Sequence, residues 1–439
     1  MHQPYYRNLK DLHFQMPWVR LHGIKDYYDM VAILDEFPDI KQTFNLVPSL
    51  IEQIEEYVSG NASDSHLELS RKAPHELKDT EKNKILKQFF SAHFPTLIQP
   101  YTRYRKLHEK MPSGITAFSD QDFLDLQVWS NLTWFDPIFK KEPFLAGLIK
   151  KEERYTEDEK QKLLDRQIEI LADIIPKYKE LQQRGQVEVS VTPFYHPILP
   201  LLCDSDIAKE SDPGIKLPKQ RFSHPEDAET QVQAAIEFYE KRFGQKPLGM
   251  WPSEGSVSQA IIPIIAKSGI KWIATDEEVL ALSLGKSPDR NDNNNVSTSG
   301  DLYYPYKVSQ DDYELSVIFR DHVLSDRLGF VYANWNPEDA ADDFIDKLMG
   351  IKAHLDRIGS KGRLAPVILD GENAWEYYVN DGHDFLRQLY RKISDHPEIE
   401  TTTVAEYIRN AKKPRNIKKL HPGSWINHNF NIWIGHEED

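Results

Sequence analysis

The sequence has one cysteine, Cys203, among its 439 residues. An intrachain disulfide is therefore excluded, which suits a reducing compartment, and we expect a cytoplasmic protein. Cys203 follows the apolar stretch "HPILPLL", a setting typical of a buried structural thiol. No HxH, HExxH or cysteine-pair motif is present to hold a metal ion, so we expect neither a metal nor a cofactor.

Long apolar runs are also scarce, and acidic residues outnumber basic ones, 69 to 54. No stretch approaches the ~18 apolar residues that a membrane span needs, and no basic segment followed by an apolar one stands at the N-terminus. The formal net charge is −15. Such a chain has no general attraction for nucleic acid or for an anionic membrane, and a neutral ligand suits it better. The sequence predicts no particular oligomeric state.

The chain instead shows a globular composition and a strand–helix alternation. Hydrophobic residues make up 40% of the sequence and aromatic residues 11%. Residues 17–60 have the apolar spacing of helices joined by turns, and residues 156–185 form a strongly amphipathic helical pattern. From residue 186 onward, short apolar strands alternate with helical stretches. This alternation predicts an α/β fold with a parallel sheet or barrel. Residues 285–300 predict an exposed loop that folding does not require.

Acidic and aromatic residues follow the predicted strands in a repeated format. Because catalytic residues of parallel barrels stand at the carboxyl ends of the strands, we expect these residues to open onto one cleft. They occur in the stretches "QVEVSVTPFYHP" (186–197), "LGMWPSEG" (248–255), "LSVIFRDHV" (315–323) and "APVILDGENAW" (365–375). A pair of carboxylates beside indole rings is what cleavage of a glycosidic bond requires. An aspartate at a strand end can equally be a helix N-cap.

Four stretches carry a resemblance to a known family. "HQPYY" (2–6), "GQVEV" (185–189), "WPSEG" (251–255) and "LDGENAWEYY" (369–378) resemble, in this order, motif regions of glycoside hydrolase family 57. The likeness is greatest to amylopullulanase-like and α-amylase members. It implies a (β/α)7-type barrel with a following helical segment, α-glucan substrates and a retaining mechanism. By this resemblance Glu254 is the nucleophile and Asp370 the general acid/base.

Further residues of these stretches are expected to bind the substrate or to adjust the catalytic acids. His2, by the same resemblance, hydrogen-bonds sugar hydroxyls near the cleaved bond. Glu188 or His196 lines the same subsite, although alternation along the strand prevents Glu188 and its flanking residues from all facing it. Glu372 raises the pKa of Asp370 through like-charge proximity.

Aromatic and charged residues complete the predicted site. Trp251, Trp375 and Trp425 are candidate platforms for sugar rings. Arg320 and Asp321 are expected to orient the nucleophile or to bind a sugar hydroxyl.

The domain prediction places the catalytic barrel with its insertions in residues 1–380 and the start of a helical segment in 381–439. The "HQP" stretch resembles a loop that follows the first barrel strand in the family, yet here only Met1 precedes it. We therefore expect a barrel without its first strand, and a helical segment truncated soon after the aromatic stretch "GSWINHNFNIWIG" (423–435).

Several other functions stay open at this stage. A 4-α-glucanotransferase or a glucan branching enzyme would use the same carboxylate pair. A metal-dependent deacetylase or α-mannosidase-like hydrolase would need ligands such as His2, His196 and Asp276. A non-catalytic glucan-binding protein would bind glucan through its aromatic residues and would not use the carboxylate pair.

Overall fold

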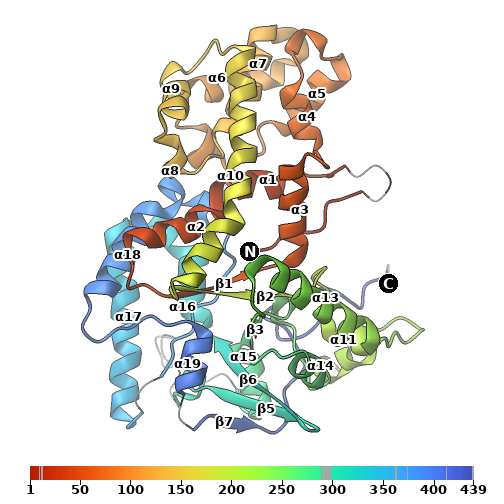
Figure 1. Ribbon diagram of the computed structural model, residues 1–439, viewed down its shortest axis with the longest axis vertical. Helices are drawn as coiled ribbons and strands as arrows, with labels where there is room; N and C mark the ends of the chain where they lie inside the picture. Colours follow the sequence, from red (N-terminus) through yellow and green to blue (C-terminus); the bar gives the residue numbers. More distant parts are fainter. Residues whose placement is uncertain are drawn as a thin grey trace.

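The computed structural model describes residues 1–8, 10, 13–287, 290, 297, 299–360, 363–372, 374–411 and 413–437. Two regions follow one another along the long axis of the molecule (Figure 1). One is a helical lobe, residues 65–156, and the other holds the sheet with its own helices. The helix α10 (Glu157–Gln183) runs from the lobe to the sheet and connects the two.

One seven-stranded sheet is the centre of the second region, in the part of the chain that is described. Its strands, in spatial order, are β1 (Gln42–Leu46), β2 (Val187–Val191), β3 (Gly249–Met250), β4 (Trp272–Asp276), β6 (Tyr313–Arg320), β5 (Tyr306–Gln310) and β7 (Arg415–Ile417). Neighbours from β1 to β6 pair in parallel, whereas β5 and β6 form an antiparallel hairpin. β7 then pairs in parallel with β5.

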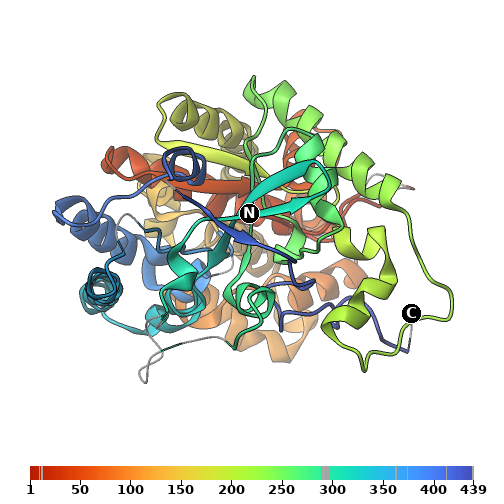
Figure 2. The same ribbon diagram turned by 90° about the horizontal axis from the view of Figure 1, so that it is seen from below.

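Helices of the lobe and of the sheet region account for most of the remaining chain. In and next to the lobe they are α1 (Trp18–His22), α2 (Asp29–Ala32), α3 (Pro48–Ser59), α4 (Ser65–Arg71), α5 (Asp79–Gln88), α6 (Thr102–Lys110), α7 (Asp120–Leu132), α8 (Pro137–Lys140) and α9 (Pro143–Lys151). Around the sheet they are α11 (Leu199–Cys203), α12 (Ala208–Ser211), α13 (Pro225–Phe243), α14 (Ile261–Lys267), α15 (Glu277–Ser283), α16 (His322–Asp326), α17 (Pro337–Arg357), α18 (His383–Asp395) and α19 (Val404–Asn410). Figure 2 shows these helices around the strands.

The predicted α/β class is confirmed by this arrangement. Parallel strands joined by helices bury the sheet on both faces, and every residue of β2 and β4 is buried. The strand order has β1 at one end and β7 at the other, and no β1–β7 pair occurs among the described strands. Closure of the barrel therefore stays a prediction. Among the same residues, no helix combines the length and apolarity needed to cross a bilayer.

Two strand predictions need correction. Residues 42–46, expected within a region of helices and turns, form β1 and pair with β2 along their whole length. Residues 365–370, expected as a strand, are extended but join no strand of the sheet. The amide of Ile368 donates to the Ser325 hydroxyl at 3.0 Å, and Pro366 has no N–H to offer. The segment nevertheless contacts the end of β6, because the Asp321 amide donates to the Pro366 carbonyl at 2.8 Å.

The chain ends lie against the sheet in ways that bear on the site. The Met1 ammonium donates to the Asn45 carbonyl at 2.9 Å, and the Val47 amide donates to the Met1 carbonyl at 3.3 Å, so Met1 lies beside β1. After α18 and α19, the chain adds β7 to the sheet and reaches the loop behind β3 at Gly423. The domain boundary at residue 380 stays a prediction.

The predicted loop 285–300 lies largely outside the described residues. Arg290, one of its described members, is half-buried, and its guanidinium pairs with Glu277 and with Asp321, the latter at 3.0 Å. The expectation that this loop is unnecessary for folding stays a prediction, although its removal would take the Arg290 cation from the buried carboxylate of Asp321 and from Glu277.

Candidate active site

Glu254 stands in a strained turn behind β3. The turn η8 (Ser253–Gly255) holds Glu254 at φ 58° and ψ 26°, in the left-handed region that side chains with a Cβ seldom adopt. The next residue, Gly255, also has a positive φ, and a Cβ there would come within 2.9 Å of the Trp251 ring. Strain of this kind persists where the surroundings impose it, often at functional sites. Here it directs the carboxylate out of the turn, with 19% of the side chain exposed.

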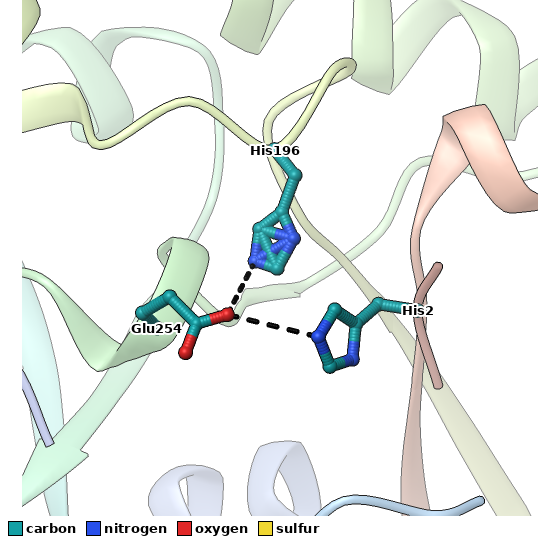
Figure 3. A group of neighbouring side chains, drawn as sticks. All are labelled: His2, His196 and Glu254. Carbon is teal, nitrogen blue, oxygen red and sulfur yellow. Dashed lines mark ion pairs between the residues drawn. The ribbon is translucent and has the colours of Figure 1, made fainter. Parts of the chain in front are cut away.

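Three side chains from distant parts of the sequence surround the Glu254 carboxylate. His2 Nε2 lies 3.7 Å from Oε1, and His196 Nε2 lies 3.4 Å from the same oxygen (Figure 3). The other oxygen, Oε2, accepts a hydrogen bond of 2.9 Å from the indole N–H of Trp425. The two oxygens therefore face different partners, and Oε1 is the one turned toward the histidines.

Trp425 is held over the turn by backbone hydrogen bonds. Its amide donates to the Glu254 carbonyl at 3.1 Å, while Val257 and Gly423 exchange both of their backbone hydrogen bonds, at 2.7 and 3.0 Å. The Trp251 and Trp425 rings meet edge to face, with centroids 5.2 Å apart. Both rings are half-buried, so an aromatic surface borders the carboxylate.

Asp370 and Glu372 reach the same histidine from the loop that follows residues 365–369. His2 Nδ1 lies 3.7 Å from Asp370 Oδ1 and 3.1 Å from Glu372 Oε1, and the His2 amide donates to Glu372 at 3.0 Å. Glu372 is fully buried, whereas a third of the Asp370 side chain is exposed. One imidazole thus stands between Glu254 and Asp370, the two carboxylates predicted to act together.

The electrostatics of this group favour a protonated Asp370. Burial raises the pKa of Asp370, the charge of His2 opposes this, and the negative charge of Glu372 raises it further, so that the net shift is upward. The predicted influence of Glu372 on Asp370 therefore has the expected sign. Burial also acts on Glu372, but the Met1 ammonium and His2 outweigh it and hold the pKa of Glu372 at about 2.

The pKa values of the two histidines are shifted in opposite directions. Burial lowers the pKa of His2, but the hydrogen bond to Glu372 and the charges of Glu372 and Asp370 raise it, and the net shift is upward. Burial, aided by the positive charge of His2, lowers the pKa of His196 to about 3, so this imidazole is neutral at ordinary pH. Among the described residues, no group hydrogen-bonds His196 Nε2, although the atom is buried.

A family comparison covers nearly the whole chain. The model of the family described as Glycosyl hydrolase family 57 matches residues 1–421. This chain belongs to glycosyl hydrolase family 57. The match includes both ends of the site, from His2 to the segment that leads to Trp425, and it confirms the resemblance of the four motif stretches.

Individual family 57 relatives are distant in sequence. An α-amylase of Pyrococcus furiosus is 24% identical over 269 residues, which make up 59% of this chain and 34% of that enzyme. The chain thus spans about a third of the length of this curated relative. The solved α-amylase of Thermotoga maritima has a TM-score of 0.58 at 14% identity, covering 99% of this chain and 77% of the other. A family 57 branching enzyme of Thermococcus kodakaraensis has a TM-score of 0.56 at 16% identity, covering 100% and 74%. These structures share the fold.

Glu188 does not lie in the site of this family 57 chain, which corrects its predicted role. It belongs to the first part of β2, opposite Thr43, whereas the site stands at the carboxyl ends of the strands. Its carboxylate accepts hydrogen bonds from the Trp272 indole at 2.8 Å, the Ala405 amide at 2.8 Å and the Thr43 hydroxyl at 3.1 Å. Glu188 therefore connects β1, β2 and β4 to the start of α19.

Glu188→Gln is expected to lower the free energy of unfolding by about 1–3 kcal/mol while leaving KM unchanged. An amide replaces one acceptor by a donor, so either the Trp272 or the Ala405 N–H would face another N–H inside the protein. Chemical denaturation and initial rates on a maltooligosaccharide would measure the two quantities. A raised KM with unchanged stability would restore the substrate-binding prediction.

Asp321 and Trp375 are also interior residues rather than substrate-binding groups. Asp321 is the N-cap of α16, accepts the Leu324 amide at 3.0 Å and the Tyr303 hydroxyl at 3.2 Å, and is fully buried. The Trp375 side chain is 2% exposed, and its indole N–H donates to the Gly371 carbonyl at 3.0 Å. Both predictions are corrected by burial, which the residue types alone do not reveal.

Arg320 lies next to the site through Trp425. Its guanidinium is 5.6 Å from the centre of the Trp425 ring, and its Nε donates to the Ile368 carbonyl at 2.8 Å. Asp276 at 3.4 Å and Asp326 pair with the same guanidinium. It therefore supports both the aromatic surface and the segment that leads to Asp370, rather than contacting Glu254.

Asp276, His322 and Asp326 form a supporting group that the sequence analysis did not assign. His322 hydrogen-bonds Asp276 and Asp326, and these bonds, opposed by burial, raise its pKa to about 10. His322 and Asp326 are four residues apart on α16, a spacing that places two side chains on one helix face. That spacing in "DHVLSD" is the signal that could have revealed them.

Proposed function

We propose that this chain is a retaining glycoside hydrolase of α-glucosidic bonds, with Glu254 as the nucleophile and Asp370 as the general acid/base. The observation that carries the proposal is the imidazole of His2, whose two nitrogens lie 3.7 Å from oxygens of these two carboxylates. The carboxylates are 116 positions apart in the sequence, and the fold brings them to one histidine. Family 57 membership supports the same reaction class.

The site can divide the reaction between its two acids. In the first step Glu254 Oε1 forms a bond to the anomeric carbon, while the bond to the leaving oxygen breaks and Asp370 gives that oxygen its proton. In the second step Asp370 takes a proton from water, the water oxygen bonds to the anomeric carbon, and Glu254 departs as a carboxylate. The Trp425 N–H on Oε2 orients the nucleophile in both steps.

The raised pKa of Asp370 and the position of His2 suit these roles. An upward shift of its pKa favours the protonated form of Asp370, which is the form that acts as an acid at the start of the cycle. His2, placed between the two carboxylates, is a hydrogen-bond donor for a sugar hydroxyl or for the charge that develops in the first step. The half-buried Trp251 and Trp425 rings offer apolar faces to the C–H groups of a sugar. We propose an α-glucan as the substrate because the relatives named α-amylase act on this class.

Product analysis on maltooligosaccharides, amylose and pullulan tests the proposal. We expect shorter oligosaccharides, newly formed reducing ends in the α-anomeric form, and a rate that a chelator leaves unchanged. Products longer than the substrate, or branched ones, would assign a 4-α-glucanotransferase or a branching enzyme instead. Loss of activity with a chelator would favour a metal-dependent hydrolase. Glucan binding without turnover would favour a binding protein.

A further inference from the structure

Three possible metal ligands converge on one point of the site. His2 Nε2, His196 Nε2 and Glu254 Oε1 all lie within 4.8 Å of one another. They come from the start of the chain, from the loop behind β2 and from the turn behind β3, and Figure 3 shows both rings directed at the carboxylate. The three side chains are partly exposed, 26% for His2, 15% for His196 and 19% for Glu254, although Nε2 of His196 itself is buried.

We propose that this triad is an inhibitory binding site for a divalent transition cation of the zinc type, and that the bound cation occupies the oxygen with which Glu254 attacks the sugar. This inference rests on the proposed function for its effect on the reaction. The binding itself depends only on the three ligands.

Two of the three ligand separations are close to those of a tetrahedral site, and the two histidine nitrogens lie within 4.8 Å of one another. Ligand atoms at about 2.0–2.1 Å from zinc stand about 3.3–3.4 Å from one another. Here the carboxylate oxygen is 3.4 Å from His196 Nε2 and 3.7 Å from His2 Nε2. Shifts of a few tenths of an ångström in side chains would complete three corners, and water would take the fourth.

The groups around the triad leave its ligand atoms facing inward. Glu372 engages Nδ1 of His2 at 3.1 Å, which is the carboxylate–histidine arrangement that orients metal-bound imidazoles. The Trp425 indole occupies Glu254 Oε2 and so leaves Oε1 toward the histidines. Within the described part of the chain, the buried Nε2 of His196 has no hydrogen-bond partner. Two imidazoles with one carboxylate favour zinc, copper or nickel over magnesium or calcium.

Binding of the cation and attack on the sugar exclude each other. The metal–oxygen bond uses the electron pair of Oε1 that would form the bond to the anomeric carbon, and any proton on His2 Nε2 passes to solvent. No electron transfer takes place. We therefore expect zinc to inhibit in competition with the glucan, and removal of the ion to restore the full rate.

Calorimetric titration of the full chain with Zn²⁺ at about pH 8 tests the site, with the visible spectrum of bound Co²⁺ as a second readout. We expect one ion per chain and the intense absorption of tetrahedral cobalt. Glu372→Gln should weaken binding by about 10–100-fold, and His196→Ala by more, because it removes a direct ligand. His224→Ala is the matched control. His224 forms an exposed pair with one carboxylate, that of Glu226 at 2.8 Å, and does not belong to the triad. It should bind zinc like the wild type.

Two further comparisons distinguish a loss of metal binding from a loss of folding, and the metal site from the proposed hydrolytic function. If the alanine variant has a lowered melting temperature, His196→Gln replaces it, because glutamine retains most of the side-chain volume. Absence of saturable zinc binding, equal affinity in the His196 and His224 variants, or an increase of the hydrolysis rate by zinc would each overturn the inference. Glu254→Gln with full hydrolytic activity would refute the proposed function, whereas the titrations would still decide the metal site.

Discussion

Glu254→Gln is expected to lower kcat on maltooligosaccharides by on the order of 10³-fold or more, with a small change in KM. The amide keeps the size of the side chain and an oxygen that can face Trp425 Nε1, but it cannot form the bond to the anomeric carbon. The glycosyl–enzyme intermediate is then inaccessible. Steady-state rates measure the loss, and the exposed Glu229, 3.7 Å from Lys267, provides the control Glu229→Gln.

Azide distinguishes a missing nucleophile from a damaged fold. In a Glu254→Ala variant, the shortened side chain leaves the space of the carboxylate to azide, which can attack an activated α-glucosyl substrate directly and produce a β-glucosyl azide. Recovery of turnover with this product supports the assignment. A variant that retains more than a tenth of the wild-type kcat, without azide, would contradict it.

Asp370→Asn is expected to reduce kcat/KM on unactivated glucans by about 10²–10⁴-fold, the usual contribution of a positioned general acid. A substrate whose leaving group needs no proton should form the glycosyl–enzyme at a much smaller penalty. With that substrate azide should restore turnover and produce an α-glucosyl azide, since it attacks the intermediate from the side that Asp370 normally serves with water. Asp165→Asn, an exposed aspartate paired with Arg71, is the control.

The pH profile gives an independent check of Asp370. An acid acts while it holds its proton, so the wild-type kcat/KM should be intact below the raised pKa of Asp370 and should fall as pH rises through it. In Asp370→Asn, no proton is lost from this position, and this alkaline decline should disappear with the activated substrate. An unchanged decline in the variant would assign the acid to another group.

Sequence patterns predicted the parallel strands that carry several apolar residues within a short run, as Val187, Val189 and Val191 do in β2. β2 and β4 are buried at every position. β1 was missed because three of the five residues in "QTFNL" are polar, so its composition does not indicate a strand. Its pairing with β2 holds this segment in the sheet. Residues 365–370 have the composition of a strand, but their amide partner is the Ser325 hydroxyl, a tertiary contact that composition does not show.

The site shows a similar division between local pattern and tertiary context. Glu254, Asp370, His2 and His196 stand in motif stretches, and the structure brings these four together. Glu188 stands in such a stretch too, but it faces the interior at the other end of its strand. Trp375 and Asp321 were likewise predicted from position, and burial decided against them. Trp425 was expected as a sugar platform, yet its hydrogen bond to Glu254 depends on a contact across 171 positions.

The contact between Trp425 and Glu254 has a consequence for the order in which the enzyme is made. Glu254 leaves the ribosome 171 residues before Trp425, which is roughly 10–30 s at ordinary rates of synthesis. During this interval the turn behind β3 has neither the indole on its carboxylate nor the backbone pair between Val257 and Gly423. The Glu254 carboxylate of a nascent chain therefore acquires its indole partner only after residues 255–425 have also been synthesised.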